Sequence, residues 1–278
     1  MQRRLIGDVE VSLLGLGTSR LCSLGARVSR SDAARLLHTA LDVGVTFVDT
    51  ADTYGSSDCE RLLGDLLATS GQRITIATKG GHTVADFPQP FRLLNQFAKK
   101  GLQFAGYRQN FEAGVIIRRI ENSLRRLRRD VIDIYFLHQP PESALADDAL
   151  IGALVDARTE GTIRCVGVAS DDPGVLRAAA TSGIFDVVQT AVNSKSSTNF
   201  AETAPILAAA GLPIVANQVL HGMREGRADA GLLLRHAAAQ TGVRVVLCRT
   251  SSPDHLRENA AALDPPLTEQ DRLTGCFR

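Results

Sequence analysis

Short apolar runs alternate with longer segments of helical periodicity along most of the chain. Such runs, bordered by polar residues or glycine, are typical of strands that are buried on both faces of a sheet. Ahead of them, the segment from Arg4 to Leu14 is predicted to form a hairpin with its turn at Gly7-Asp8. The predicted strands are Ser12–Gly15, Thr46–Asp49, Ile74–Thr78, Ile132–Leu137, Cys165–Val168, Val187–Gln189, Ile214–Ala216 and Val243–Leu247.

The segments between these strands place apolar residues on one face of a helix, which indicates that each helix packs on a sheet. Two such stripes are Ala33, Leu36, Leu37, Ala40 and Leu41, and Ile116, Ile117, Ile120, Leu124 and Leu127. Ser31 is the expected N-cap of the first helix. Further helices are predicted near residues 58–69, 143–160, 173–182, 200–210, 228–240 and 254–262.

Serial strand–helix pairs predict a parallel sheet that is covered by helices. For eight such pairs in 278 residues, we expect one domain over residues 1–278, a closed (β/α)8 TIM barrel preceded by the short N-terminal hairpin. The alternative is an open doubly wound sheet. Its first strand would lead into a G-x-G-x-x-G fingerprint, but the segment from Gly15 to Arg20 has arginine at the third glycine position.

Residues 84–112 form an inserted loop that is longer than a strand–helix connection requires. The loop contains half of the ten phenylalanines and one of the three tyrosines: Phe87, Phe91, Phe97, Phe104, Phe111 and Tyr107. It could pack as an apolar cluster on the barrel, or form a wall or lid over a substrate site. The sequence leaves both roles open.

Composition narrows the classes of partner. With 31 Lys and Arg against 30 Asp and Glu, the net charge of +1 gives no electrostatic reason to expect nucleic acid or an anionic membrane. The arginines between 118 and 129 are expected on the solvated face of a helix. The N-terminus lacks an apolar signal region and nowhere do about 18 apolar residues run together, so we expect a cytoplasmic protein without a membrane span.

Neither the cysteines nor any short motif indicates a metal site. Cys22, Cys59, Cys165, Cys248 and Cys276 are widely spaced, which predicts reduced thiols and no metal. The motifs of zinc proteases, EF-hands and α/β-hydrolases are not found in the sequence.

Three polar residues lie where neighbouring predicted strands end, which is where barrels build their active sites. Asp49, Lys79 and His138 end or follow the second, third and fourth strands, and Tyr54 lies in the loop after Asp49. Each could have an ordinary structural role, but together they predict an acid–base cluster. An adjacent ammonium would lower the pKa of the Tyr54 hydroxyl, and a carboxylate would hold that ammonium.

A candidate phosphate site follows the last strand. The segment from Arg249 to Pro253 combines a cation, hydroxyl groups and the N-terminus of a helix. The alternative is a simple helix cap beside a surface arginine.

The segment from Phe47 to Gly55, followed by Glu60 and Leu63-Gly64, resembles the signature of the aldo-keto reductase superfamily. The similarity, to a member of bacterial type, extends from Leu14 to Glu258-Asn259. It implies that Tyr54 donates a proton to a substrate carbonyl, that Lys79 and Asp49 tune it, and that His138 orients the carbonyl. It further implies hydride transfer from a nicotinamide, with NADP(H) favoured and NAD(H) possible.

The resemblance also implies a set of cofactor contacts: Gly17, Thr18, Ser170, Gln189, Asn217, Leu220, Gly222, Arg249, Thr250, Ser251, His255, Glu258 and Asn259. Four positions depart from the family pattern. Ala169 and Ser170 stand where the family often has Ser-Asn, and Val192 stands where an aromatic ring would stack on the nicotinamide. His255 stands where many NADP-preferring members have arginine.

Together these features predict an enzyme that interconverts an aldehyde or ketone and an alcohol, acting on a small carbonyl or sugar-like substrate. The departures motivate one alternative, a slow nucleotide-sensing or regulatory subunit on the same barrel. A weaker alternative is a lyase or epimerase that uses Tyr54 and Lys79. The sequence does not specify the substrate or the oligomeric state.

Overall fold

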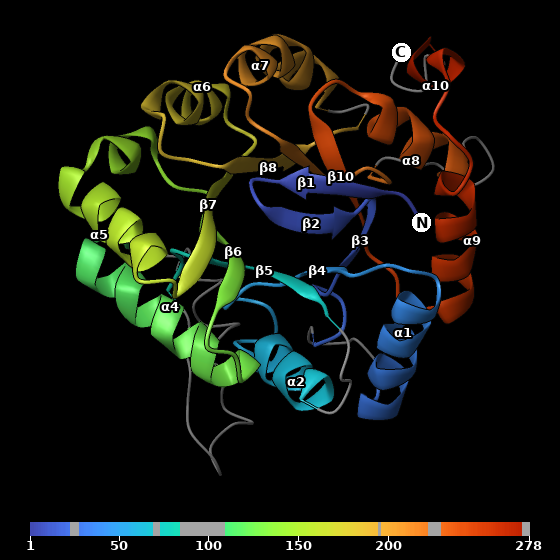
Figure 1. The fold of residues 1–278 in the computed structure, drawn as a ribbon, viewed down its shortest axis with the longest axis horizontal. Helices are drawn as coiled ribbons and strands as arrows, with labels where there is room; N and C mark the ends of the chain where they lie inside the picture. The colour runs from blue at the N-terminus through green and yellow to red at the C-terminus, as the bar shows by residue number, and fades with distance from the viewer. Residues whose placement is uncertain (23–27, 69–72, 84–108, 194–195, 222–228, 274–278) are drawn as a thin grey trace.

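The computed structural model describes residues 1–22, 28–68, 73–83, 109–193, 196–221 and 229–273. Within these ranges, eight parallel strands close into a barrel in the order β10-β3-β4-β5-β6-β7-β8-β9 (Figure 1). The strands are β3 (Leu14–Gly17), β4 (Phe47–Asp49), β5 (Thr75–Gly80), β6 (Ile132–His138), β7 (Ile163–Ala169), β8 (Val187–Ala191), β9 (Ile214–Asn217) and β10 (Val243–Cys248). The predicted (β/α)8 barrel is confirmed.

Helices surround the barrel, as Figure 1 shows. They are α1 (Arg30–Asp42), α2 (Asp58–Leu67), α4 (Ala113–Leu127), α5 (Asp148–Thr159), α6 (Pro173–Ser182), α7 (Ser197–Ala209), α8 (Ala230–Ala239), α9 (Pro253–Leu263) and α10 (Glu269–Leu273). The helix predicted near 143–160 is instead a 3₁₀ turn, η2 (Glu142–Ala146), followed by α5. The division falls at Asp147, whose carboxylate caps α5 by accepting from the backbone of Ala149 and Leu150 at 2.9 and 3.2 Å.

The prediction that Ser31 caps α1 is wrong, because the cap is Ser29. The Ser29 hydroxyl accepts from the backbone N–H of Asp32 at 3.0 Å, and the Asp32 carboxylate accepts from the backbone N–H of Ser29 at 3.4 Å. This reciprocal capping box needs an acidic side chain three residues after the cap, a condition that Asp32 meets for Ser29. Ser31 lies inside the helix.

The predicted hairpin is confirmed, whereas the first predicted strand, Ser12–Gly15, is divided between two elements. β1 (Arg3–Ile6) pairs antiparallel with β2 (Val9–Ser12), and the barrel begins at β3. In Figure 1 the hairpin lies across the middle of the ring of strands. The Ser12 hydroxyl joins it to the barrel by accepting from the backbone of Thr46 and Phe47 at 2.9 and 3.1 Å.

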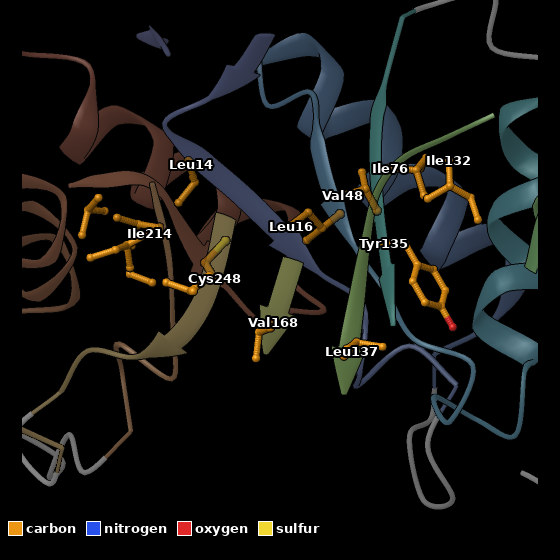
Figure 2. Packing of buried hydrophobic residues seen from close by; sticks show 14 of the residues in the cluster. Leu14, Leu16, Val48, Ile76, Ile132, Tyr135, Leu137, Val168, Ile214 and Cys248 are labelled. Atoms are coloured by element: carbon orange, nitrogen blue, oxygen red, sulfur yellow. The ribbon is translucent and has the colours of Figure 1, made fainter. Parts of the chain in front are cut away.

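Alternation along each strand creates two cores, one inside the barrel and one between barrel and helices. On β6, Ile134 and Phe136 join the inner cluster, which the hairpin completes with Ile6 and other residues. The outer cluster contains the other face of each strand, including Tyr135, and in Figure 2 its labelled side chains project from the strands.

The expectation that the arginines between 118 and 129 all lie on a solvated face is wrong for two of them. Arg119 donates to Asp52 at 2.8 Å, and Arg126 donates to Glu60 at 2.7 Å. Both carboxylates are buried, so each needs a cation, and α4 supplies it across its contact with α2 and the loop before it.

Most of the predicted insertion, including Phe87, Phe91, Phe97, Phe104 and Tyr107, lies outside the described residues. At the described end of the insertion, Phe111 is buried and packs against Gly81. A Cβ on Gly81 would come within 2.3 Å of the Phe111 ring. A bridge joins His82 to Gln109 and brings this segment to the end of β5. Among the helices that the structure describes, none has the length and apolar character needed to span a membrane.

Candidate active site

Asp49, Lys79 and His138 come together because β4, β5 and β6 are adjacent and parallel. Asp49 and His138 are the last residues of β4 and β6, and Lys79 is the penultimate residue of β5. The strands therefore bring all three to the carboxyl end of the barrel. This is the end at which barrel enzymes bind their substrates.

Lys79 is the centre of the cluster. Its ammonium donates to Asp49 Oδ1 at 2.6 Å, to the carbonyl oxygen of Thr50 at 2.8 Å and to the Tyr54 hydroxyl at 3.5 Å. The Lys79 side chain is 1% exposed. A charge this deeply buried is stable only when paired and hydrogen-bonded, and these contacts fix the ammonium beside the phenol. Asp49 Oδ1 also accepts from Gln189 Nε2 at 2.9 Å.

The acidity of Tyr54 differs from the prediction. Burial raises the pKa of the Tyr54 hydroxyl above its ordinary value, and the nearby Lys79 lowers it by less. The sequence argument considered the ammonium alone and omitted the loss of water around the ring. Tyr54 is therefore held as a neutral phenol, a form that can donate a proton.

His138 is held in its uncharged form. Burial, together with the positive charges of Lys79 and His82, places the pKa of His138 well below its ordinary value. The His82 and His138 rings meet edge to face with 4.8 Å between centroids. Sequence reasoning missed His82, although a histidine shortly after Lys79 at the end of β5 is a signal that could have found it.

A cavity of about 210 Å³ opens over this cluster. Its lining is Gly17, Asp49, Tyr54, His138, Gln139, Ala169, Ser170, Asp171, Gln189, Asn217, Gln218, His221, Leu247 and Arg249. Two buried atoms of this lining, His138 Nδ1 and Asn217 Oδ1, have no hydrogen-bond partner among the described residues. Because unpaired buried polar atoms are costly, both suit a bound polar ligand.

A second cavity of about 260 Å³ shares Gln218, His221, Leu247 and Arg249 with the first and adds Arg20, Val219 and Leu220. Neither Arg20 nor Arg249 forms an ion pair with any residue that the structure describes. Tyr54 and these two guanidinium groups therefore line two adjoining cavities. Adjoining cavities of this kind suit an elongated ligand with an anionic end.

Of the predicted cofactor contacts, Gly17, Ser170, Gln189, Asn217 and Arg249 line the first cavity, and Leu220 lines the second. Because Gly17 has no side chain, Arg249 can pack closely against it: a Cβ on Gly17 would come within 2.9 Å of Arg249 Cγ. Gly222 lies outside the described residues.

Other predicted contacts have local partners instead. The Thr18 hydroxyl is buried and donates to the Asp49 carbonyl at 3.0 Å. Thr250 accepts from the backbone of Ser252 at 3.0 Å, and Asn259 is buried beside Cys248. Ser251 precedes α9, His255 and Glu258 lie on it, and all three are exposed. Val192 is buried and lies on a different cavity, between α7 and α8.

Sequence reasoning also missed Asp171 and Gln218, which join three loops at the cavity. Asp171 accepts from the backbone of Ala191 at 2.7 Å and from Gln218 Nε2 at 3.1 Å. The carboxylate therefore links the ends of β7, β8 and β9. No local motif marks it, because its partners come from distant segments of the chain.

The loop that carries Tyr54 is fastened to the barrel wall. Asp52 donates its backbone N–H to the Lys79 carbonyl at 3.1 Å, and its carboxylate receives Arg119. Burial raises the pKa of Asp52 to about 7, while Arg119 acts in the opposite direction.

The fold and this cluster define a (β/α)8 barrel with a cluster of ionisable side chains at its carboxyl end. The sequence model of the Aldo/keto reductase family matches residues 13–232, so the chain belongs to the aldo/keto reductase family. This confirms the resemblance described above.

Curated relatives include a 6-dehydroglucose reductase of Novosphingobium aromaticivorans, 33% identical over 58% of this chain and 48% of that protein. A pyridoxal 4-dehydrogenase of Microbacterium luteolum is 31% identical over 66% of this chain and 60% of that protein. The aligned segments thus span about half to three fifths of these relatives.

Solved structures share the fold. An aldo-keto reductase of Bacillus halodurans in its holo form has a TM-score of 0.80 at 24% identity, over 98% of this chain and 94% of that one. An aldo-keto reductase of Klebsiella pneumoniae in complex with NADPH has a TM-score of 0.73 at 24% identity, over 98% and 93%.

Proposed function

We propose that the protein is an NADP(H)-dependent oxidoreductase that interconverts a carbonyl compound and its alcohol. The observation that carries this proposal is the hydrogen bonding of the buried Lys79 ammonium to Asp49 and Tyr54, beside an uncharged His138 at the mouth of the barrel. Membership of the aldo/keto reductase family supports it.

In this proposal the residues divide the work between proton transfer and orientation. Tyr54 donates its proton to the substrate oxygen, and Lys79 stabilises the phenolate that remains. Asp49 holds Lys79, and His138 orients the substrate oxygen by a hydrogen bond. A reduced nicotinamide, when bound, supplies the hydride.

The residues present fit such a cofactor. Asn217 Oδ1, a buried acceptor without a partner among the described residues, suits the N–H groups of a carboxamide. Arg20 and Arg249, which have no carboxylate partner there, suit phosphate groups. The NADPH complex of the Klebsiella pneumoniae protein supports the choice of NADP(H), and NAD(H) is the alternative.

A hydroxyl-bearing carbonyl compound is the proposed substrate class. The described lining of the cavity is mostly polar, with Gln139, Asp171 and Gln218 beside Tyr54 and His138. A further hollow of about 490 Å³ continues past Gln139 and Asp171 to Gln109, Glu142 and Asp172. Amide and carboxylate groups are hydrogen-bond partners for hydroxyls, which favours the sugar-like substrate over a purely apolar one. The 6-dehydroglucose reductase and pyridoxal 4-dehydrogenase relatives are consistent with this class.

The first experiment titrates the purified protein with NADPH and NADH and follows cofactor fluorescence, because the chain has no tryptophan. We expect tighter binding of NADPH, and weaker binding of NADPH after Arg249→Ala. A regulatory subunit would bind NADPH without turning over any carbonyl in a broad panel. Failure to bind either nucleotide would refute the proposal and favour the lyase alternative.

The second experiment assigns the proton donor. Tyr54→Phe should leave NADPH affinity nearly unchanged and lower turnover by about 10²–10⁴-fold, the usual contribution of a general acid. The control, Tyr135→Phe, removes a buried hydroxyl that faces Gly80 on the outer side of the barrel and should retain turnover. Full activity in Tyr54→Phe would refute the assignment.

A further inference from the structure

Two cysteines beside the Tyr54 loop take no part in the proposed reaction. Cys22 lies in the loop after β3, and Cys59 lies in the first turn of α2. Their side chains are in hydrogen-bonding contact although they lie far apart in the sequence. Cys59 is 1% exposed, whereas Cys22 is partly exposed.

The pair is connected to both sides of the site. The Cys59 thiol donates to the Thr18 carbonyl at 3.3 Å, and its backbone N–H donates to the Tyr54 carbonyl at 3.3 Å. Cys22 packs on Gly55, where a Cβ would come within 2.5 Å of the Cys22 Cβ. A change at these two sulfurs would therefore displace Thr18, which follows Gly17 in the cavity wall, and Tyr54, the proposed proton donor.

The connecting loop is under backbone strain. Gly55, Ser56 and Ser57 have successive φ values of 61°, 53° and 71°, in the left-handed region that serines rarely adopt. Such backbone persists only where its surroundings hold it. Here the surroundings include Cys22 on one side and the first turn of α2 on the other.

We propose that Cys22 and Cys59 are an oxidation site at which a hydroperoxide converts two thiols into a disulfide and thereby displaces the Tyr54 loop. In the first step the Cys22 sulfur attacks the O–O bond, forms a sulfenic acid and releases water. In the second step the Cys59 sulfur attacks the Cys22 sulfur, the S–OH bond breaks, and a second water leaves. Two thiols and one hydrogen peroxide thus give one disulfide and two waters.

The roles of the two sulfurs follow from their surroundings. Contact with Cys22, followed by burial, raises the pKa of the Cys59 thiol, so Cys59 is the less reactive sulfur toward peroxide and acts in the second step, where its proton leaves with the sulfenic hydroxyl as water. Cys22 is the partly exposed residue of the pair, so the first step is assigned to it. Closure to about 2.05 Å between sulfurs removes the hydrogen bond from Cys59 to Thr18 and draws the two loops together.

The remaining described cysteines lack this arrangement. Cys165 donates to the Ile6 carbonyl at 3.7 Å at the hairpin end of the barrel, and burial raises its pKa to about 12. Cys248 is buried beside Asn259, and burial likewise raises its pKa to about 12. Neither has a cysteine partner among the described residues.

The test treats the purified chain with stoichiometric hydrogen peroxide, blocks remaining thiols and maps tryptic peptides by mass. The expected product joins Leu21–Arg27 to Leu36–Arg61, with the loss of two hydrogen atoms, and disappears on reduction with dithiothreitol. Cys22→Ser should abolish it, and the control Cys248→Ser should not. A Cys22 that stays reduced, stops at sulfinic acid or pairs with Cys276 would overturn the proposal.

A second measurement tests the displacement, which rests on the proposed function. Turnover should fall by about 10–100-fold in the oxidised protein and return on reduction, because small displacements of reacting groups have effects of this size. Cys22→Ser should keep its turnover in peroxide. Unchanged turnover in the cross-linked protein would overturn the displacement. If the untreated protein showed no turnover, the proposed function would fail, and the peptide map would still decide the oxidation site.

Discussion

At the scale of single residues, burial determines the charge states of the site. Burial raises the pKa of Tyr54 despite the influence of Lys79, and burial, Lys79 and His82 lower that of His138. Near neutral pH the site therefore has a phenol that can donate a proton and an imidazole without charge. Residue types and spacing predicted which four groups meet, but not the direction of the Tyr54 shift, because the depth of burial depends on the whole barrel.

The pKa shifts of Tyr54 and His138 predict different pH profiles for carbonyl reduction and for alcohol oxidation. Carbonyl reduction should be nearly independent of pH from about 6 to 9, because Tyr54 stays protonated and His138 stays neutral throughout that range. Alcohol oxidation, in which Tyr54 must accept a proton, should rise with pH over the same range. Steady-state kcat in each direction measures both profiles. A reduction rate that falls with a midpoint near pH 7 would contradict these charge states.

The buried pair of Lys79 and Asp49 also makes a prediction about stability. Lys79→Met should lower the free energy of unfolding by about 3–5 kcal/mol, because it leaves the Asp49 carboxylate buried without its cation. The double variant Lys79→Met, Asp49→Asn should recover part of this loss, since the introduced amide would carry no charge and its oxygen could still accept from Gln189. Urea unfolding of both variants measures the difference. An equal or larger loss in the double variant would argue against an uncompensated charge as the cause.

At the scale of elements, the apolar stripes in the sequence predicted where the helices lie. They did not predict which residues form ion pairs with the charged side chains on those helices. Arg119 and Arg126 were predicted to be exposed to solvent because the apolar periodicity of the sequence places them on the polar side of α4. Their carboxylate partners lie 67 and 66 positions earlier in the chain, on the Tyr54 loop and α2. A periodic pattern reports which face of a helix is apolar and carries no information about a partner on another element.

The close contact of α2 with α4 gives a prediction about two helical glycines. A Cβ on Gly64 in α2 would lie 2.2 Å from the Arg126 carbonyl oxygen, whereas one on Gly152 in α5 would meet nothing within 4 Å. Gly64→Ala should therefore cost about 1–3 kcal/mol of unfolding free energy. The matched control Gly152→Ala should gain about 0.5–1 kcal/mol from helix propensity alone. Thermal or urea unfolding distinguishes them, and a stabilising Gly64→Ala would refute the close contact.

At the scale of the molecule, the barrel was predictable because the strand–helix pattern repeats eight times. An error at the boundary of one strand does not change the number of strands predicted. The division of Ser12–Gly15 between hairpin and barrel is such an error. The cavity was less predictable. Asp171 and Gln218 line it, and His82 contacts His138, only because closure of the barrel brings the ends of different strands together. The sequence marks each strand end separately and does not state which side chains point inward.

The last prediction concerns the hairpin that covers one end of the barrel. Two neighbouring residues of β1 serve as the test position and its control. Ile6 is fully buried in the inner cluster with Val9 and Val11, whereas its neighbour Leu5 is 59% exposed. Ile6→Ala should cost about 2–5 kcal/mol of unfolding free energy through lost burial and the cavity left behind. Leu5→Ala, with the same change of size in solvent, should stay within about 0.5 kcal/mol.

Because the hairpin covers the end of the barrel opposite the candidate site, Ile6→Ala should leave NADPH affinity unchanged wherever the protein remains folded. Strand ends at the carboxyl side carry the site, and the amino side of a barrel serves stability. Fluorescence titration well below the unfolding temperature measures the affinity. A weaker affinity in folded Ile6→Ala would show that packing inside the barrel transmits changes from the hairpin to Asp49 and Lys79, through inner-cluster residues such as Phe47 and Ala77 on the same strands.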